Sequence, residues 1–146
     1  MSDFRVLSDS VMASPQVSLA DIDEAAAQGV TLVICNRPDD EEPGQLNVAD
    51  IEAAAAKHGM EFSHIPISGA GFSEPQVEAM RDALDGAAGK VLAYCRSGTR
   101  STLLWSLSEA SRGRDPQAIA ADAQAAGYDV TPVRPAMDML ANKADG

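Results

Sequence analysis

The strongest constraint on the fold is a regular alternation of short apolar runs with segments of helical periodicity. Residues 30–35, 60–66 and 91–95 form the apolar runs, each too short for a helix but suited to a buried strand. The segments between them carry apolar residues at helical spacing, bounded by capping residues and glycines. Strands separated by helices need crossover connections, which give a mostly parallel sheet covered by helices on both faces. The sequence therefore predicts an α/β fold.

The predicted helices are bounded by residues that favour helix starts and ends. Serine or aspartate precedes several of them, and glycine follows most of them. The predicted ranges are Ser18 to Gly29, Val48 to His58, Ser73 to about Leu84, Ser101 to Arg112, Asp115 to about Gly127, and Ala136 to about Lys143. Two short apolar patches, residues 4–7 and 11–13, come before the first helix and are assigned to no element.

Length and composition indicate one globular domain over residues 1–146, because domains commonly span about 100–200 residues. Hydrophobic residues make up 45% of the chain and charged residues 23%, which is close to the globular average and excludes a disordered chain. A core of this size folds without disulfides or a structural metal. Neither histidine has a cysteine at a zinc-ligand interval, so we expect no metal and no organic cofactor.

The formal charge of −11 at pH 7 makes the surface repel phosphate backbones and anionic headgroups. We therefore expect no nucleic-acid partner and no membrane partner. The N-terminal sequence lacks a basic segment with a long apolar stretch after it, and no apolar run approaches the ~20 residues of a spanning helix. Two cysteines are too few for a disulfide framework. These features predict a cytoplasmic protein and leave the oligomeric state open.

One motif carries chemistry: the segment 95–101, Cys-Arg-Ser-Gly-Thr-Arg-Ser, between a predicted strand and a predicted helix. Backbone N–H groups of such a loop and the helix N-terminus together form a bowl for an anion. Gly98 permits the torsions that this bowl requires, and the guanidinium of Arg100 adds a planar fork of donors. The surroundings favour the thiolate form of Cys95 and make it a candidate nucleophile. Ser101 is placed to donate a hydrogen bond to that thiolate.

The other residues of this loop have weaker predicted roles. Arg96, Ser97, Gly98 and Thr99 are expected to line the anion-binding loop, with Arg96 pointing outward to substrate or solvent. A cysteine that ends an apolar strand is often only a small buried hydrophobe. The glycine, arginine and serine that follow Cys95 favour a functional role instead.

These residues resemble the cysteine-dependent phosphatases, whose signature is Cys, five residues, Arg, then Ser or Thr. The chain more closely resembles a bacterial family, the phosphatase-like domain of beta-lactamase-hydrolase-like proteins, some members of which are called sulfur transferases. The matching segments are Ser14–Ser18, Asn36–Asp39 with Glu42–Gly44, His64–Ile67, and Ala93–Ser101. The resemblance implies a tyrosine/dual-specificity phosphatase-like fold, with Cys95 as nucleophile and Arg100 as the anion-binding residue.

Two departures from the phosphatase pattern bear on the reaction. Four residues separate Cys95 from Arg100, one fewer than in the phosphatase signature. This count is similar to that of rhodanese-type sulfurtransferases, whose tight loop cradles a cysteine persulfide. In addition, Ser68 stands where relatives usually carry the aspartate that protonates the leaving group. General-acid help is worth about 10²–10⁴ in rate, so its loss favours activated substrates.

Other residues near the predicted loops are candidate acids or substrate contacts, because the carboxyl ends of parallel strands meet at one edge of a sheet. The candidates are Arg37, Asp39, Asp40, Glu41, Glu42, Ser68 and Glu74. The alternative for the acidic run is a solvated loop. Arg37 either reaches toward the anion or pairs with neighbouring carboxylates, and the pairing is favoured.

Four further residues have a structural and a functional interpretation. Cys35 is either a core residue, which is favoured, or a resolving thiol. His64 either packs or bonds beneath the loop, and Trp105 is a core anchor. Tyr94 replaces the histidine that commonly precedes the nucleophile in phosphatases.

Three functions follow from this motif. The leading hypothesis is a cysteine-dependent, phosphatase-like hydrolase that acts on a small activated phosphoester. The alternative is a sulfurtransferase that forms a persulfide on Cys95 from thiosulfate or a glutathione persulfide. The third is a non-catalytic module that binds an anion or a phosphoprotein. In the enzyme hypotheses the partner is a small anion, because an acidic surface attracts large anionic partners poorly.

Overall fold

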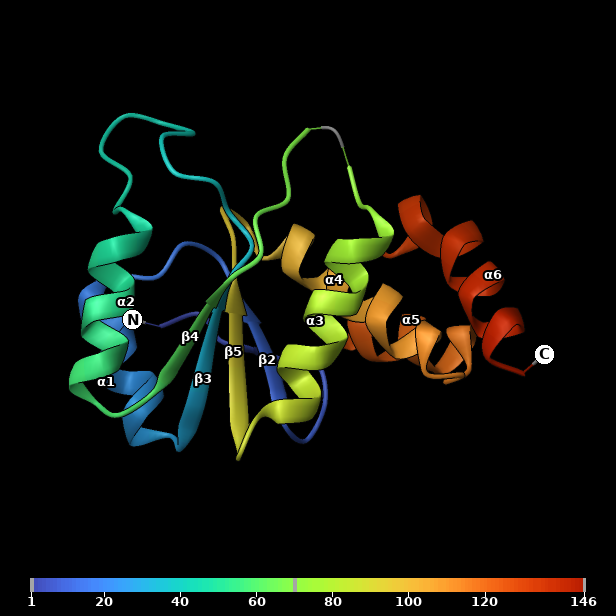
Figure 1. The fold of residues 1–146 in the computed structure, drawn as a ribbon, viewed down its shortest axis with the longest axis horizontal. Coiled ribbons are helices and arrows are strands. Elements are labelled where there is room, and N and C mark those ends of the chain that lie inside the picture. Colours follow the sequence, from blue (N-terminus) through green and yellow to red (C-terminus); the bar gives the residue numbers. More distant parts are fainter. Residues whose placement is uncertain (1, 70, 146) are drawn as a thin grey trace.

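The computed structural model describes residues 2–69 and 71–145, which alternate between strands and helices around a central sheet (Figure 1). The strands are β1 (Arg5–Val6), β2 (Val11–Ser14), β3 (Val30–Cys35), β4 (Glu61–His64) and β5 (Lys90–Tyr94). The helices are α1 (Leu19–Ala27), α2 (Val48–Lys57), α3 (Glu74–Gly86), α4 (Thr99–Ser111), α5 (Pro116–Ala125) and α6 (Arg134–Asp145), with a 3-10 turn, η1 (Thr131–Val133), before α6.

The described strands form a sheet in the order β1-β2-β5-β3-β4. β2, β5, β3 and β4 are parallel, and β1 pairs antiparallel with β2 at the edge. β5 is central, so its last residue, Tyr94, lies in register with Ser14 on one side and Cys35 on the other. The predicted α/β fold with a mostly parallel sheet is confirmed.

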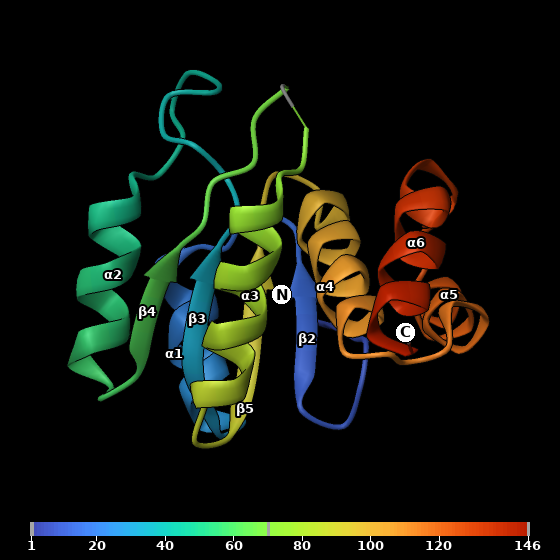
Figure 2. The ribbon, with the colours of Figure 1, turned by 45° about the vertical axis from the view of Figure 1, so that its right-hand side comes forward.

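Helices cover both faces of the sheet (Figures 1 and 2). α1 and α2 pack on one face through buried residues such as Ile22 and Ile51. α3 and α4 pack on the other face, and α5 and α6 pack against α4. Helices thus lie on both faces of the sheet, as the crossover connections between parallel strands require.

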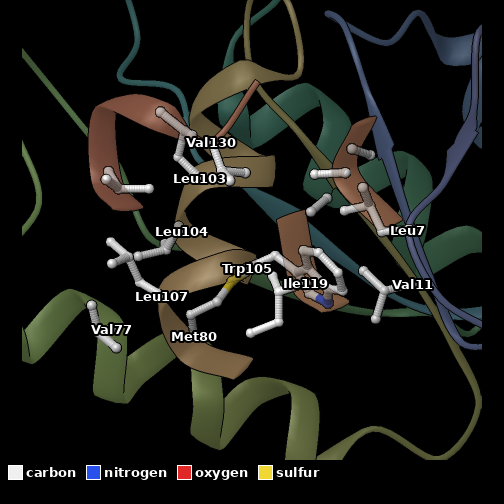
Figure 3. Packing of buried hydrophobic residues seen from close by; sticks show 14 of the residues in the cluster. Leu7, Val11, Val77, Met80, Leu103, Leu104, Trp105, Leu107, Ile119 and Val130 are labelled. Atoms are coloured by element: carbon white, nitrogen blue, oxygen red, sulfur yellow. The ribbon is translucent and has the colours of Figure 1, made fainter. Parts of the chain in front are cut away.

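α4 is the most deeply buried helix, and every residue from Ser101 to Ser108 is buried. Figure 3 shows its Leu104, Trp105 and Leu107 among side chains that include Met80 of α3 and Ile119 of α5, as expected of a core tryptophan. The buried hydroxyls of Thr102, Ser106 and Ser108 donate to carbonyls of the preceding turn, which satisfies them inside the core. Among the described residues, no helix is long and apolar enough to cross a membrane.

The structure differs from the sequence-based expectation at several element boundaries. The patch at residues 11–13 belongs to β2, a wholly buried parallel strand that the sequence did not identify because a four-residue run carries no periodicity. α4 begins at Thr99 rather than Ser101, because Gly98 adopts φ +90° and serves as its N-cap. β4 ends at His64, before Pro66, whose ring nitrogen has no N–H to donate to the sheet.

Replacing Leu104 with alanine should lower the free energy of unfolding by about 2–5 kcal/mol, because it leaves a cavity beside α3 and α5. The matched change Leu19→Ala, at a leucine that is 49% exposed on α1, should stay within about 0.5 kcal/mol of wild type. Urea unfolding followed by circular dichroism measures both. Equal losses would contradict the placement of Leu104 in the core.

Candidate active site

The loops that leave the carboxyl ends of the parallel strands are joined by hydrogen bonds. Arg100 Nη1 donates to the Ile67 carbonyl at 2.7 Å, which ties the loop after β5 to the chain after β4. Arg37 Nη1 donates to Gln16 Oε1 at 2.8 Å, which ties the loop after β3 to the loop after β2. The Gln16 N–H in turn donates to the Arg96 carbonyl at 3.2 Å. The three loops predicted to converge do so, and the loop after β2 joins them.

Cys95 lies at the centre of this cluster and is fully buried. Its Sγ accepts the Gly98 N–H at 3.1 Å, so the loop curls around the sulfur. Ser97 Oγ accepts the Thr99 N–H at 3.3 Å and donates to Thr99 Oγ1 at 2.9 Å, which holds the outer side of the loop. Hydrogen bonds within the loop thus hold it closed around the sulfur.

Tyr128, which follows α5, supports the loop from beneath. Its hydroxyl donates to the Ser97 carbonyl at 3.2 Å, and the Arg5 guanidinium lies 5.1 Å from the centre of its ring. A Cβ at Gly98 would come within 2.1 Å of the Tyr128 hydroxyl, so only glycine fits there. Burial raises the pKa of Tyr128 and keeps the hydroxyl protonated as a donor. Sequence reasoning missed Tyr128, because it stands 28 positions from Arg100 with no motif around it.

Glu41 holds Arg100 in place. The Arg100 Nη1 and Nη2 groups donate to its two carboxylate oxygens, each at 2.8 Å. The hydrogen bond from Arg100, followed by that from Arg37, holds the pKa of Glu41 below its usual range despite partial burial. Glu41 is therefore ionised at neutral pH and a poor proton donor in this arrangement, although the sequence offered it as a substitute acid.

Arg37 is fully buried and has a carboxylate or amide partner for each of its three nitrogens. Nε donates to Glu41, Nη1 to Gln16 and Nη2 to Glu42, all at 2.8 Å. The predicted pairing with neighbouring carboxylates is the arrangement observed. Arg37 thus holds the acidic loop in place from a fully buried position.

The remaining candidate acids have other roles in this structure. Asp39 accepts the Val48 N–H at 2.8 Å, which caps α2, and Asp40 is exposed with φ +64°. Glu74 is exposed at the start of α3, in a depression shared with α6. The Ser68 carbonyl accepts the Gly71 N–H at 3.1 Å in a turn whose third residue, Ala70, lies outside the described residues.

Two loop residues differ in exposure. Arg96 is exposed, as predicted, and pairs with Glu42 at 3.3 Å. Ser101 is buried, and its hydroxyl has no hydrogen-bond partner within residues 2–69 and 71–145. The predicted hydrogen bond from Ser101 to Cys95 is therefore not formed in this structure, where the sulfur instead accepts the Gly98 N–H.

Cys35 lies beside Cys95 but on the opposite face of the sheet. It is in register with Tyr94, and consecutive residues of a strand point to opposite faces. The Cys35 thiol donates to the Arg37 carbonyl at 3.2 Å, and His64 Nε2 lies 3.0 Å from the same oxygen. Burial raises the pKa of the Cys35 thiol. These contacts favour the structural interpretation of both residues.

No group of three histidine, cysteine, aspartate or glutamate side chains within residues 2–69 and 71–145 is arranged to hold a metal ion.

Comparisons with solved structures identify the class of fold. A candidate phosphatase from Neisseria meningitidis Z2491 aligns with a TM-score of 0.84 and 35% identity, over 96% of this chain and 99% of that chain. Kinase associated phosphatase aligns with a TM-score of 0.74 at 14% identity, over 100% of this chain and 96% of that chain, and shows the fold alone. The chain has a tyrosine/dual-specificity phosphatase-like fold.

The family follows from the sequence match. Residues 3–112 match the family described as "Beta-lactamase hydrolase-like protein, phosphatase-like domain", and the chain belongs to this family. A beta-lactamase hydrolase-like protein from Agrobacterium fabrum is 39% identical over 99 residues, 68% of this chain. Because those residues cover 23% of that protein, the chain spans less than a quarter of this relative in the alignment. The resemblance inferred from the motifs is confirmed.

Gly98→Ala should destabilise the protein more than Gly29→Ala does. Both glycines have φ near +90°, but a Cβ at Gly29 meets nothing within 4 Å, whereas one at Gly98 meets Tyr128. The strain common to both costs about 1–3 kcal/mol, and the collision should add about 1–3 kcal/mol at Gly98. Urea unfolding measures the difference, and equal losses for the two variants would contradict the close approach of Tyr128.

Glu41→Gln should lower stability at neutral pH by about 1–2 kcal/mol, through the loss of charged hydrogen bonds to Arg37 and Arg100. Because the pKa of Glu41 is lowered in the folded state, its contribution is complete above the ordinary value of 4.5 and is lost as the pH falls through the folded value. Wild type and variant should therefore converge in acid. Urea unfolding from about pH 7 to about pH 3 tests this. A gap that persists in acid, or one shared by Glu52→Gln on the exposed side of α2, would contradict it.

Proposed function

We propose that this chain is a cysteine-dependent hydrolase that acts on a small activated phosphoester. The observation that supports this proposal is the position of Cys95 at the end of the central strand. Its sulfur accepts a hydrogen bond from the Gly98 N–H, and Arg100 lies beside it. The Cys95 thiolate attacks phosphorus, and the bond from phosphorus to the leaving oxygen breaks. Water then cleaves the sulfur–phosphorus bond, which releases inorganic phosphate and restores the thiol. The phosphatase-like family supports this reaction class.

Arg100 is proposed to stabilise the transferring group. Glu41 and the Ile67 carbonyl take both hydrogens of Nη1 and one hydrogen of Nη2. The Nε–H and the other Nη2 hydrogen share one edge of the guanidinium, and that edge suits two oxygens of a tetrahedral anion. The hydrogen bonds that Arg100 donates to Glu41, and next the electrostatic effect of the neighbouring Cys95, raise the pKa of Arg100 against the effect of burial. Together with the first backbone N–H groups of α4, this edge forms the proposed oxyanion site.

The proposed substrate is activated because, among the described residues, the carboxyl group beside Arg100 is a poor proton donor. Ser68 stands at the position where relatives carry aspartate, and Glu41 is held in its ionised form by Arg100 and Arg37. An alkyl leaving group needs a proton as it departs, whereas an aryl oxide or a phosphate leaves without one. Aryl phosphates and phosphoanhydrides are therefore the proposed class.

Sulfur transfer is a second candidate, favoured by the tightness of the loop around a fully buried sulfur. In this reaction the Cys95 thiolate attacks the sulfane sulfur of thiosulfate, the S–S bond breaks, and sulfite departs with its electron pair. Cyanide or a thiol then removes the outer sulfur and restores the thiolate. Only one atom is added to Cys95, and no general acid is needed.

We also propose that residues 1–146 act as one phosphatase-like domain. α5 and α6 lie beyond the matched residues 3–112, yet Ile119, Ala123 and Met137 belong to the same core cluster as α3 and α4. The C-terminal helices therefore support the site through Tyr128 and the buried face of α4.

The two reactions are distinguished by offering p-nitrophenyl phosphate and, separately, thiosulfate with cyanide. We expect nitrophenol release that is lost in Cys95→Ser and retained in Cys35→Ser, the matched change at the other cysteine. Thiocyanate without nitrophenol, with intact mass showing one added sulfur atom on Cys95 after thiosulfate, would replace the phosphatase proposal by sulfur transfer. Activity that survives Cys95→Ser would reject both reactions, and no activity with either substrate would favour a non-catalytic anion-binding module.

A further inference from the structure

An unbroken chain of ion pairs runs from Arg96 to Arg100, the two arginines of the proposed anion-binding loop. Arg96 contacts Glu42 at 3.3 Å, and Glu42 contacts Arg37 at 2.8 Å. Arg37 contacts Glu41 at 2.8 Å, and Glu41 contacts Arg100 at 2.8 Å. Each carboxylate thus bridges two arginines. The three positive and two negative side chains together carry a net charge of +1. The positive charge of the three arginines is therefore largely neutralised by the two carboxylates.

These charges act at short range with little screening. The Arg37 side chain is fully buried, and the side chains of Glu41 and Glu42 are only 27% and 37% exposed. Charges that are partly removed from water are screened by salt much less than exposed ones. Hydrogen bonds from the arginines hold the pKa of both carboxyl groups below the usual range, so both are ionised at neutral pH.

The summed charge of the site falls by one when Cys95 is in the thiolate form that the proposed reaction requires. Three arginines, two glutamates and one thiolate sum to zero before any ligand arrives. A doubly charged anion then enters a site whose summed charge is zero, so no net charge compensates for the hydration that it loses. A singly charged anion loses less hydration free energy and is therefore disfavoured less. The oxygens of a ligand still find the free edge of Arg100 and the amides at the start of α4, which recognise shape more than total charge.

We propose that Glu41 and Glu42 determine the charge of the substrate, so that the site prefers a singly charged tetrahedral anion to a doubly charged one. This inference rests on the proposed function, because it assumes that the loop 95–100 holds the transferring group. The singly ionised form of an aryl phosphate monoester is the matching substrate. Glu41 and Glu42 are specificity-determining residues in this proposal and need not touch the reacting atoms.

The test compares two anions that present the same SO₃ face, sulfate with two charges and methanesulfonate with one. Each is titrated against the rate at which neutral iodoacetamide alkylates Cys95, at constant ionic strength, in a Cys35→Ser background with one thiol. The variants are Glu41→Gln and Glu42→Gln. The control is Asp138→Asn, which removes one charge from an ion pair with Arg134 on α6.

In the unmodified site we expect methanesulfonate to protect Cys95 at a lower concentration than sulfate does. Each glutamine variant should tighten sulfate binding about tenfold and methanesulfonate binding about threefold, because Coulomb energy is proportional to the charge of the ligand. Asp138→Asn should change neither value. If Glu41→Gln unfolds the protein because it weakens one of the three hydrogen bonds of the buried Arg37, Glu42→Gln, at the more exposed carboxylate, supplies the same comparison.

Tighter binding of sulfate by the unmodified site, or equal shifts for both anions in the glutamine variants, would overturn the inference. Protection by neither anion would overturn both the inference and the proposed anion site. A site that discriminates by charge but releases no nitrophenol would leave the inference standing and reject the hydrolase.

Discussion

The buried guanidinium of Arg37 is the interaction on which the arrangement of the site depends. A charge taken out of water is costly unless every donor finds an acceptor, and here each nitrogen has one. The same three bonds join the loop after β3 to the loop after β2 and orient Glu41 toward Arg100. Removing one partner of such a network leaves an uncompensated charge in the interior. The geometry of Arg100 is therefore held by a residue that is itself fully buried.

The fold was predictable because its determinants are local. Runs such as residues 30–35 have strand character without any knowledge of their neighbours, and capping at Ser18 and Asp21 marks a helix start, with both predicted capping bonds present. The crossover rule then converts this order into a parallel sheet. β2 was missed because its place beside β5 depends on tertiary pairing, and four residues carry too little pattern to show it.

The site was predictable only where one segment carries all the chemistry. Cys95, Gly98 and Arg100 share a loop, and the torsion of Gly98 and the position of Arg100 follow from that loop. Tyr128 and Gln16 contact the loop from distant parts of the chain, and single residues without a motif give no signal. Glu41 was recognised as part of an acidic run, but its role changed from proton donor to arginine partner once the ion pairs were visible. Pairing between loops is a property of the folded chain, which spacing alone does not reveal.

The placement of the two cysteines has a consequence for how the protein withstands oxidants. Cys35 and Cys95 end neighbouring strands but point to opposite faces of the sheet, so their Cβ vectors diverge and a disulfide between them would require backbone movement. The sequence contains no third cysteine. A sulfenic acid formed on Cys95 is therefore not captured as a disulfide with Cys35, and its return to the thiol through a disulfide depends on an external thiol. The durability of the proposed nucleophile is thus set by the thiol pool around the protein.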